Sequence, residues 1–556
     1  MIGSISLKEI TFKNGYKLIL EENSIVLFVG ANNSGKSVTL KELYTALLKN
    51  NTLKNVAIAS IATKTSGSVE DFKENIEHRL INGSYFSKAQ SPFQDDGLKR
   101  AWDNNDSGIL SQFNVNILHT SDRLNLVSPP SSIDLLSQPP VHPFHTLQMN
   151  GDLLADFTRY FKTAFDIDIT LNFGAGGNVP MHVGKKPIIK EGDDRVSSSY
   201  LKNLKELPQL QVQGDGMKSF AGVFLSLIAE NYGINLIDEP EAFLHPPQAK
   251  LLGQMISKNV HENKQILIAT HSEHFLKGIL DYAGDRLTII RLKRENNVVE
   301  YSTLNNNDLK IIWKDSILRH SNVLDGLFHS KVVLCESDSD CRLLSALATA
   351  IVEHEVMPSP DIHYIQAGGK ARFPTVMNAL KQIDVPLTII ADFDLYNNEQ
   401  PLKEMYEIMG GNWADIQKEF KIVKQDIDNQ RPELNTVDAK KALENVFDEA
   451  SEPNLSDKQI KELQQILKKS SAWTKAKSAG KAILTAGDAT VAFKKLNLHL
   501  EKVGIIIIQI GEIESFDKSV GNHGPKWVNS VLEKDLILSP DLEEIRCFVK
   551  TYILNI

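Results

Sequence analysis

The feature that most constrains this 556-residue chain is a glycine-rich loop inside the segment SIVLFVGANNSGKSVTLKELYTALL. Gly30 to Ser37 fits the pattern G-x-x-x-x-G-K-[ST], and its flanks predict a strand before the loop and a helix after it. In such a loop the backbone N–H groups wrap phosphates, the lysine reaches the terminal phosphates and the hydroxyl holds magnesium. The sequence therefore predicts a nucleotide site with the candidate binding residues Gly30, Asn33, Gly35, Lys36 and Ser37.

Two later apolar segments predict the rest of that site. Asp238 ends the segment GINLI and can hold magnesium, directly or through water. Glu239 follows as the candidate catalytic base, which would orient the water that attacks the γ-phosphate. The segment QILIA is followed by Thr270 and His271. A lone histidine at a strand end is usually structural, but the order of phosphate loop, Asp-Glu and Thr-His favours a γ-phosphate sensor.

The composition is typical of a globular protein and does not by itself indicate a function. The chain is 42% hydrophobic and 24% charged, which is ordinary for a globular protein of about two to four domains. Its cysteines, Cys335, Cys341 and Cys547, are odd in number and lack metal-type spacing, which predicts a reducing cytoplasm. The longest apolar runs are too short to span a bilayer, so no membrane partner is expected. The formal net charge of −9 leaves nucleic-acid binding open, because acids in metal sites can mask a basic groove.

After residue 325 the alternation of strand and helix restarts, and acids stand at the predicted strand ends. Glu336 ends one apolar segment, with Asp340 in the helix that follows it. Asp392 and Asp394 end the segment LTIIA. Because side chains alternate along a strand with period two, these two carboxylates are expected to point the same way.

The strand-end acids are predicted to converge, because the carboxyl ends of parallel strands lie at one edge of an open sheet. One or both of Glu512 and Glu514, after the segment GIIIIQI, would join them. Oxygen-only clusters suit magnesium or manganese rather than zinc. Asp392 and Asp394 would repel each other by roughly 4 kcal/mol at about 4 Å and an effective dielectric near 20, so a cation is expected there. The alternative is a solvated turn, where Asp and Asn are common.

The nucleotide-site residues resemble those of the ATP-binding-cassette type of ATPase found in the SMC-like and OLD families, including the stretch EPEAFLHP. The resemblance covers about residues 1 to 300. It implies that two heads close around ATP, with a signature segment of one subunit facing the phosphate loop of the other, and hence at least a homodimer. The candidate segment QGDGMKSFAGVFLSL, with Gly214, Gly216 and Ser219, departs from the usual serine–glycine form. A plain glycine turn before a core helix is the alternative.

The C-terminal order of an acidic strand end, a Gly-Gly-Lys loop and Asp-x-Asp resembles the TOPRIM domain, whose acids hold divalent metals for phosphodiester chemistry. A TOPRIM domain after a cassette ATPase is the arrangement of the OLD family of ATP-dependent nucleases. The resemblance implies catalytic roles for Glu336 and Asp392, and Ser337 stands where a glycine is usual. It implies metal roles for Glu336, Asp340, Asp392, Asp394, and Glu512 or Glu514.

The segment GEIESFDKSVGNHGPKWV matches the last strand of that domain and its basic residue. The match implies that Lys526 stabilises charge in the transition state. A surface lysine on a helix is the alternative. Which of Glu512 and Glu514 would bind metal is left open by the motif.

The implied fold class is α/β: an ABC-type P-loop ATPase domain followed by a TOPRIM α/β domain that carries a helical insertion. The expected boundaries are 1–310 for the ATPase domain, 145–205 for a small insert in it, 326–556 for the TOPRIM domain and 399–500 for the helical insertion. The insertion holds a lysine cluster around Trp473, which would grip a nucleic-acid backbone or form a solvated helix face. The lysines are Lys468, Lys469, Lys475, Lys477 and Lys481.

The leading function is an ATP-regulated, divalent-metal-dependent DNA endonuclease, with ATP at one site and Mg²⁺ or Mn²⁺ at both. The resemblance implies defence against phage or other foreign DNA, and leaves open a partner protein or RNA of a larger system such as a retron. One rival is a non-cleaving, ATP-dependent nucleic-acid sensor or assembly protein. Another is a topoisomerase-like or primase-like enzyme, but the nucleophilic tyrosine and gate domains of a strand-passing enzyme are not identifiable.

Overall fold

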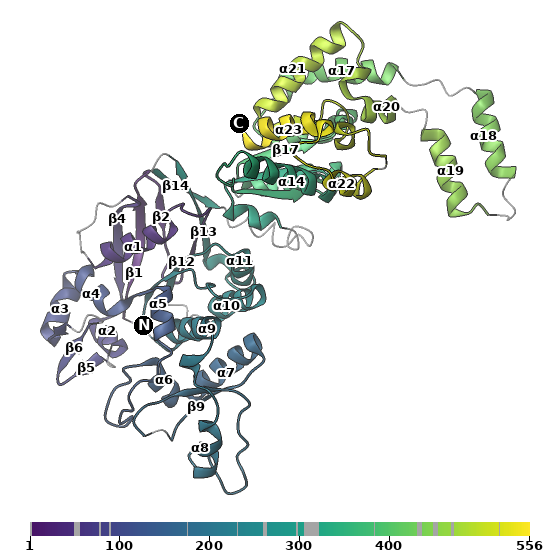
Figure 1. Ribbon diagram of the computed structural model, residues 1–556. Coiled ribbons are helices and arrows are strands. Elements are labelled where there is room, and N and C mark those ends of the chain that lie inside the picture. The colour runs from purple at the N-terminus through teal and green to yellow at the C-terminus, as the bar shows by residue number, and fades with distance from the viewer. Residues whose placement is uncertain are drawn as a thin grey trace. The chain divides into compact units, whose positions relative to one another are not determined.

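The computed structural model describes residues 3–48, 56–76, 79–87, 91–174, 176–230, 232–259, 264–295, 298–304, 322–382, 384–430, 436–448, 454–468, 472–521 and 523–556. The chain divides into two compact units, Met1–Asp315 and Ser316–Ile556 (Figure 1). The expected domain boundary, between residues 310 and 326, falls largely outside the described residues. Within the described part of the chain, no helix combines the length and the apolar character that a membrane crossing requires.

The first unit is built on a six-stranded sheet in the order β14-β13-β3-β12-β11-β8. Five of these strands run parallel, and β14 pairs antiparallel with β13 at one edge. Every residue of β3 and β12 is buried, as expected for central strands covered on both faces. In sheet order the strands are β14 (Val298–Leu304), β13 (Leu287–Glu295), β3 (Ile25–Val29), β12 (Gln265–Ala269), β11 (Ile234–Asp238) and β8 (Val115–Leu118).

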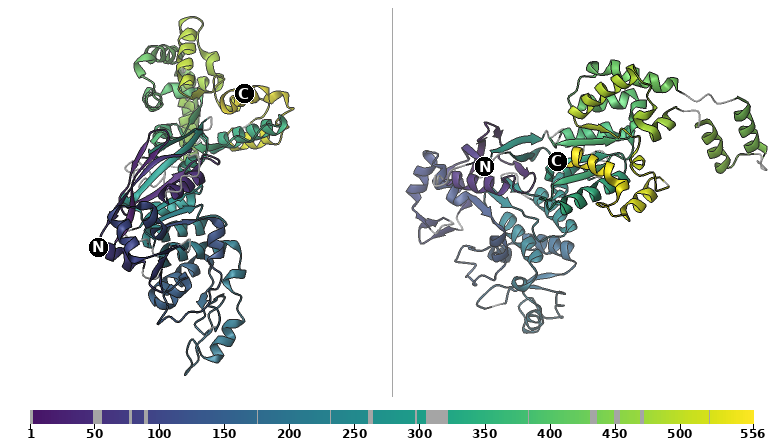
Figure 2. Two further views of the ribbon diagram at one scale, coloured as in Figure 1. Left: turned by 90° about the vertical axis from the view of Figure 1, so that its left-hand side faces the viewer. Right: turned by 45° about the horizontal axis from the view of Figure 1, so that its top comes forward.

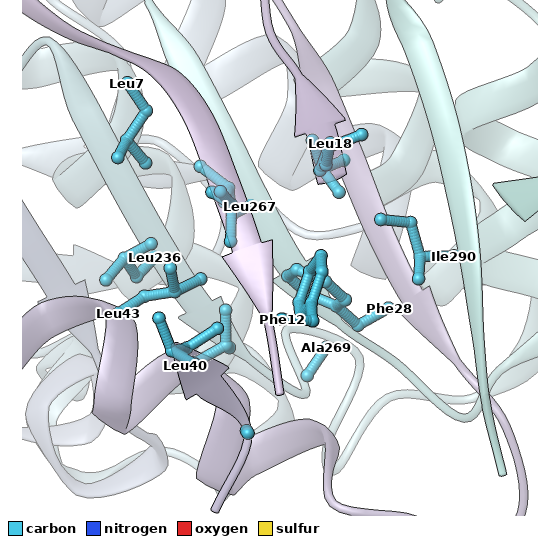
Figure 3. Packing of buried hydrophobic residues seen from close by; sticks show 14 of the residues in the cluster. Leu7, Phe12, Leu18, Phe28, Leu40, Leu43, Leu236, Leu267, Ala269 and Ile290 are labelled. Atoms are coloured by element: carbon cyan, nitrogen blue, oxygen red, sulfur yellow. The ribbon is translucent and has the colours of Figure 1, made fainter. Parts of the chain in front are cut away.

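A smaller antiparallel sheet, in the order β2-β1-β4, packs against this one. In the left view of Figure 2 its purple strands lie alongside the teal strands of the six-stranded sheet. Phe12 from the small sheet stacks on Tyr301 with ring centroids 4.0 Å apart, and it meets Phe28 of β3 edge-on. Figure 3 shows this core, in which Leu40 and Leu43 of α1 also take part. The bounds are β1 (Ser4–Phe12), β2 (Lys17–Ile19), β4 (Ile58–Ser66) and α1 (Lys36–Leu47).

Helices flank the large sheet, and a short hairpin lies within the expected insert at 145–205. There β9 and β10 pair antiparallel between α7 and α8. Further elements of this unit are α2 (Val69–Asn75), β5 (Leu80–Ile81), β6 (Ser84–Phe86), β7 (Pro92–Phe93), α3 (Asp95–Asp103), α4 (Ser107–Asn114), α5 (Thr120–Asn125), α6 (Pro143–Met149), α7 (Gly151–Phe165), β9 (Ile169–Leu171), β10 (Met181–Val183), α8 (Ser198–Lys205), α9 (Asp215–Phe224), α10 (Pro246–Asn259) and α11 (Glu273–Leu280).

The second unit contains a four-stranded parallel sheet in the order β16-β15-β17-β18. From β15 the chain crosses to β16 on one side and then returns to β17 on the other. The connections therefore diverge between β15 and β17, and ligand sites of open α/β sheets form outside the carboxyl ends of strands at such a switch point. The strands are β15 (Lys331–Cys335), β16 (Ile362–Gln366), β17 (Leu387–Ala391) and β18 (Ile505–Ile507).

Helices α14, α22 and α23 share a buried core with this sheet. Between β17 and β18, the described residues form the helices α16 to α21. The helices of the unit are α14 (Asp338–His354), α15 (Phe373–Gln382), α16 (Glu399–Ile408), α17 (Gln417–Asn429), α18 (Thr436–Asp448), α19 (Asp457–Lys468), α20 (Ala472–Ala479), α21 (Asp488–Lys502), α22 (Pro525–Leu532) and α23 (Glu543–Phe548).

Candidate active sites

The phosphate loop leaves the carboxyl end of β3 and turns directly into α1. Three of its residues have left-handed backbone angles: φ is 142° at Gly30, 62° at Asn33 and 105° at Gly35. At Gly30 a Cβ atom would lie 2.3 Å from the carbonyl oxygen of Leu292 in β13, so a side chain would collide with the neighbouring strand. The Nζ of Lys36 donates to the Gly30 carbonyl at 2.8 Å, inside the loop.

Ser37 and Asp238, the two residues expected to hold magnesium at the nucleotide, are in direct contact. The Ser37 hydroxyl donates to Oδ1 of Asp238 at 2.8 Å across 201 positions of sequence. Ser37 lies at the start of α1, after β3, and Asp238 ends β11; β3 and β11 both flank β12 in the parallel sheet, so their carboxyl ends lie at one edge. A hydroxyl beside a carboxylate is the hard oxygen donor set that suits Mg²⁺.

Glu239 and His271 also meet at this edge, together with Glu241. The Nδ1 of His271 lies 3.4 Å from Oε1 of Glu239 and 3.4 Å from Oε1 of Glu241. Glu241 is only 5% exposed, and its Oε1 accepts from the Thr270 hydroxyl at 2.7 Å and from the His271 N–H at 3.0 Å. Glu241 belongs to the EPE stretch, but the sequence pattern does not predict this role, which depends on the pairing of β12 with β11.

The candidate base has an unusual backbone and a defined charge state. Glu239 has a φ of 47°. This left-handed conformation costs a non-glycine residue about 1 to 3 kcal/mol and persists only where surrounding bonds hold it. Its N–H donates to the Ala269 carbonyl at 2.8 Å. The hydrogen bond to His271 lowers the pKa of Glu239 and raises that of His271, whereas burial raises the pKa of Glu241. Glu239 is therefore ionised at neutral pH, as a base must be.

The candidate signature segment forms the start of α9. Gly214 is the exposed N-cap, and at Gly216 a Cβ atom would lie 2.8 Å from the Phe243 carbonyl oxygen. Ser219 is fully buried, and its hydroxyl accepts from Nε of Arg123 at 2.9 Å. Ser219 as placed cannot contact the nucleotide of another subunit, because it lies beneath the surface. That contact stays a prediction for Gly214 and Gly216 only.

In the second unit the expected acids gather beyond the carboxyl ends of β15 and β17. Glu336 directly follows β15, and Asp392 directly follows β17. Strand β17 ends at Ala391, and Asp394 lies in the 3-10 turn η7 (Phe393–Asn397). Strand alternation is therefore the wrong reason for the convergence of Asp392 and Asp394, because the chain turns before Asp394 is reached.

Two carboxylate oxygens in this cluster are buried without a partner. Oε2 of Glu336 and Oδ1 of Asp394 have no hydrogen-bond partner among the described residues. Asp392 begins the η7 turn but its side chain does not accept a capping hydrogen bond from that turn. These facts do not fit a solvated turn in which the acids cap the backbone. They do fit a divalent cation, which would satisfy buried oxygens that lack donors.

Asp340 has a local structural role as well as a place near the cluster. Its Oδ2 accepts from the backbone N–H of Ser337 at 2.9 Å, while the Ser337 hydroxyl accepts from the Asp340 N–H, which together form a capping box for α14. Ser337 has an extended backbone with a φ of −127°, so the glycine usual at this position is not required.

Glu512 and Glu514 lie together with His523 after β18, and one ligand atom from each lies within 4.8 Å of the others. Oε1 of Glu512 is 3.6 Å from Nδ1 of His523. Oε1 of Glu514 accepts from the Gly524 N–H at 2.8 Å. Both glutamates therefore face the cluster, and His523 is a neighbour that the sequence argument did not single out.

The positive charge near these acids comes from unexpected lysines. Nζ of Lys477 lies 3.3 Å from Oε2 of Glu512 and 3.7 Å from Oδ2 of Asp392. Lys370, from the Gly-Gly-Lys loop, forms an ion pair with Asp394. Lys526 is exposed at the start of α22 and has no ion pair with any residue that the structure describes.

Lys477 is held at the cluster by close packing of the inserted helix α20. At Gly511, after β18, a Cβ atom would lie 2.3 Å from the carbonyl oxygen of Lys477. At Gly480, just after α20, it would lie 2.2 Å from the Gln509 carbonyl oxygen. The φ angles of 124° and 57° at these glycines exclude most other residues as well. The two glycines allow the insertion to approach the sheet backbone directly, which a sequence pattern does not reveal.

Burial and mutual proximity raise the pKa values of three acids of this cluster. Burial raises the pKa of Asp392 well above its usual range, and the carboxylate of Glu336 raises it further. Burial also raises the pKa values of Glu336 and Asp340. Burial alone would lower the pKa of Lys477, but Asp392 and Glu512 raise it above its ordinary value. Lys477 is therefore protonated at neutral pH, and its ammonium compensates part of the negative charge of these acids.

The residues predicted to bind a nucleic-acid backbone in the insertion have different surroundings in the structure. Trp473 is buried, and its indole N–H donates to Asp428 at 2.7 Å, so its ring is not available to stack on bases. Lys481 donates to the Gln509 side chain at 3.0 Å, and Lys475 is exposed. Of the two remaining lysines of the cluster, Lys469 lies outside the described residues and the side chain of Lys468 is not described.

Comparison with known families agrees with both halves of this architecture. The model named AAA_21, whose description reads AAA domain and refers to the AbiEii toxin and Type IV TA system, matches residues 81–277. The model described as "Overcoming lysogenization defect protein-like, TOPRIM domain" matches residues 327–394, which contain Glu336, Asp340, Asp392 and Asp394. The predicted resemblance to the OLD family is confirmed by the TOPRIM match and by the OLD nucleases among the relatives. The predicted fold class, an ABC-type P-loop ATPase domain followed by a TOPRIM domain, is confirmed.

Curated OLD relatives match only part of this chain. The Old nuclease of Escherichia phage P2 is 26% identical over 167 residues, which are 29% of this chain and 28% of that protein. The OLD nuclease of Thermus scotoductus is 25% identical over 180 residues, which are 30% of this chain and 32% of that protein. The chain thus matches less than a third of the length of either relative.

Among solved structures, an Smc head bound to the C-winged helix domain of ScpA covers 56% of this chain and 100% of its own, at 12% identity and a TM-score of 0.35. So low a TM-score supports no argument about this protein.

Proposed function

We propose that this OLD-family chain is an ATP-regulated, divalent-metal-dependent DNA endonuclease. The observation that carries the proposal is the group of buried acids at the switch point of the second sheet, where Glu336 and Asp394 each keep an unpartnered oxygen. Placing several ionised carboxylates together in a partly buried site is costly unless cations compensate them. The TOPRIM match over this region supports phosphodiester chemistry as the use of such a site.

In the proposed nuclease site, Glu336, Asp340, Asp392, Asp394 and one or both of Glu512 and Glu514 would hold Mg²⁺ or Mn²⁺. Such ions, when bound, make water acidic enough to act as a nucleophile and stabilise the leaving oxygen. Lys370 and Lys477 form ion pairs with the carboxylates of Asp394 and Asp392 and would hold them in place in the site. Lys526 is exposed and forms no ion pair with a described acid, so it would stabilise charge there only on contact with the substrate.

In the proposed ATPase site, the phosphate-loop amides and Lys36 bind the phosphates, while Ser37 and Asp238 would hold Mg²⁺. Glu239 accepts a proton from the attacking water, and His271 orients its carboxylate through the 3.4 Å contact. The lowered pKa of Glu239 supports this role, since an ionised carboxylate is needed to accept the proton. Coupling of this reaction to DNA cleavage is what makes the nuclease ATP-regulated.

The partners follow from the family rather than from contacts within the chain. We propose DNA as the substrate and at least a homodimer as the working assembly, in which Gly214 at the exposed start of α9 faces the ATP of a second copy. Defence against phage or other foreign DNA, alone or with a partner protein or RNA, is the proposed setting. A reducing cytoplasm suits the three free thiols Cys335, Cys341 and Cys547.

The test is to incubate the purified chain with plasmid DNA and Mg²⁺ or Mn²⁺, with and without ATP, beside two variants. Asp392→Ala removes an acid of the buried cluster, and the matched control Asp338→Ala removes an acid from the same sheet edge that is 63% exposed and paired with Arg342. We expect cleavage by wild type and Asp338→Ala but not by Asp392→Ala. DNA binding that depends on ATP, without cleavage under any metal condition, would instead establish the non-cleaving sensor.

A further inference from the structure

Arg123 of α5 is a fully buried guanidinium that neither proposed reaction uses. Its Nε donates to the Ser219 hydroxyl at 2.9 Å. Its Nη1 donates to the Asp238 carbonyl at 2.8 Å, and its Nη2 donates to the Glu239 carbonyl at 2.7 Å and to the Thr120 hydroxyl at 3.2 Å. One side chain therefore joins three elements: α5, α9 and the end of β11.

The partners of Arg123 belong to segments with different expected tasks. Ser219 lies on α9, the helix that begins at the candidate signature glycine Gly214. Asp238 and Glu239 carry the expected magnesium ligand and the expected base. The two segments are not bonded to each other through any other side-chain hydrogen bond found among the described residues, so Arg123 is the polar link between them.

Backbone packing fixes Arg123 in this position. A Cβ atom at Gly222 of α9 would lie 2.2 Å from the carbonyl oxygen of Arg123, so α9 lies directly on the backbone of α5. Movement of α9 along its axis would therefore shift Arg123, and with it the carbonyl of Glu239. Because Glu239 is held in a left-handed conformation with a φ of 47°, the orientation of its carboxylate depends on bonds of this kind.

The charge of Arg123 also argues for a working role. A buried cation is costly to desolvate, and a neutral side chain of similar volume would fill the space at lower cost. The direct partners of the guanidinium are carbonyl and hydroxyl oxygens, and the carboxylates of Glu241, Asp238 and Glu239 act on it from further away. The cation is thus placed where its field reaches the acids of the ATP site.

We propose that Arg123 is a positioning residue that couples helix α9 to Glu239, so that the state of the candidate signature segment sets the orientation of the base. This inference rests on the proposed ATPase activity, and it adds a route by which one half of the ATP site controls the other. The hydrogen bond to Ser219 makes the Arg123 side chain follow the position of α9. The hydrogen bond to the Glu239 carbonyl then makes the backbone of Glu239 follow Arg123.

The experiment compares three variants of the full chain. Ser219→Ala breaks only the link to α9 and leaves the bonds from Arg123 to β11. Thr120→Val is the matched control, because it removes another hydroxyl partner of the same guanidinium, one that belongs to α5 itself rather than to α9 or β11. Arg123→Lys keeps the charge but loses the forked geometry that joins the segments. Phosphate release gives kcat, titration with a non-hydrolysable ATP analogue gives Kd, and thermal melting reports folding.

We expect Ser219→Ala to lower kcat by about fivefold or more with Kd within about twofold of wild type, and Arg123→Lys to lower kcat further. For Thr120→Val, kcat and Kd should both stay within about twofold of their wild-type values. A Ser219→Ala protein with wild-type kcat would overturn the coupling, as would equal losses in Ser219→Ala and Thr120→Val. If wild type itself releases no phosphate, the proposed ATPase function fails first, and the coupling falls with it.

Discussion

The two acidic sites of this chain share a position in the fold and differ in electrostatics. Both lie beyond the carboxyl ends of parallel strands. In the first unit Asp238 accepts from Ser37, Glu241 accepts from Thr270, and His271 lies beside both Glu239 and Glu241. In the second unit lysines pair with Asp392 and Asp394, but neighbouring carboxylates also act on one another. The pKa of Glu239 is accordingly lowered, mainly by its hydrogen bond, whereas burial and neighbouring carboxylates raise that of Asp392.

This difference shows that the pKa of an acid at a strand end depends on the residues around it. Glu239 is ionised without added metal and is ready to accept a proton. Burial raises the pKa values of Asp392, Glu336 and Asp340, so nearby cations favour the charged forms of these three acids, and Lys477 supplies part of that compensation. The first site is thus built around an ionised base, and the second around acids whose charged forms are favoured by nearby cations.

The largest expected effect is on cleavage. Asp392→Asn should reduce plasmid cleavage about a thousandfold or more, because it removes one carboxylate charge from a metal-binding group, while ATP hydrolysis stays within about threefold. Gel-based cleavage and phosphate release, measured on the same preparation, separate the two activities. Parallel loss of both activities would mean that the two acidic sites do not act separately.

The converse substitution addresses the first unit. Glu239→Gln should lower ATP hydrolysis by about a hundredfold or more while ATP still binds, since the amide cannot accept the proton of the attacking water. Lys36→Ala should instead abolish tight ATP binding, because the phosphates lose their cation. Equilibrium binding of labelled ATP distinguishes the two. Turnover retained by Glu239→Gln would reject its role as the base.

A comparison of two lysines sharpens the account of the second site. Lys477→Ala should lower cleavage by about ten- to a hundredfold, because Asp392 and Glu512 lose their nearest ammonium. Lys526→Ala, at an exposed position, should change cleavage by less than about threefold. The reverse ranking, in an initial-rate assay at saturating metal, would restore the sequence-based role of Lys526.

Metal should stabilise the second unit through its acids. Manganese at about a hundred times its Kd should add about 2.7 kcal/mol to the stability of the folded state, and thus raise Tm by several degrees. In Asp392→Asn that shift should be clearly smaller, whereas in Glu239→Gln it should match wild type. Differential scanning fluorimetry with and without manganese gives both shifts. An equal shift in Asp392→Asn would remove Asp392 from the metal site.

The smallest effect is an opposite dependence of metal-free stability on pH. The lowered pKa of Glu239 gives a contribution that is present above the ordinary carboxyl pKa of about 4 and is lost as pH falls. The raised pKa of Asp392 gives one that is complete below about pH 4 and is lost as pH rises through the folded-state pKa. In EDTA, Asp392→Asn should therefore reduce the fall in Tm as the pH rises toward neutral. Glu239→Gln should reduce the fall in Tm as the pH drops into the acid range. If both substitutions reduced the fall in Tm over the same pH range, the two sites would not differ in this way.

Local patterns in the sequence were sufficient for much of the two sites. The phosphate loop, the acid after β11 and the acids after β15 and β17 each follow directly from an apolar run and the residues next to it. Strand ends and loops depend on neighbours in the chain, and parallel strands bring their ends to one edge, so Ser37 and Asp238 could be paired in advance. The family and the fold class followed from the same motifs.

Only the tertiary structure decided which side chains surround those acids. Arg123 reaches the Asp238 carbonyl across 115 positions, and Lys477 reaches Asp392 from an inserted helix that no strand pattern places. Burial likewise removed Ser219 from the surface and turned Trp473 toward Asp428. Such contacts depend on how helices pack on a sheet and on where glycines such as Gly480, Gly511 and Gly222 allow backbones to meet. Local sequence patterns thus place the reactive groups, whereas packing sets their charge and their partners, because electrostatic effects act through space between segments that are far apart in the chain.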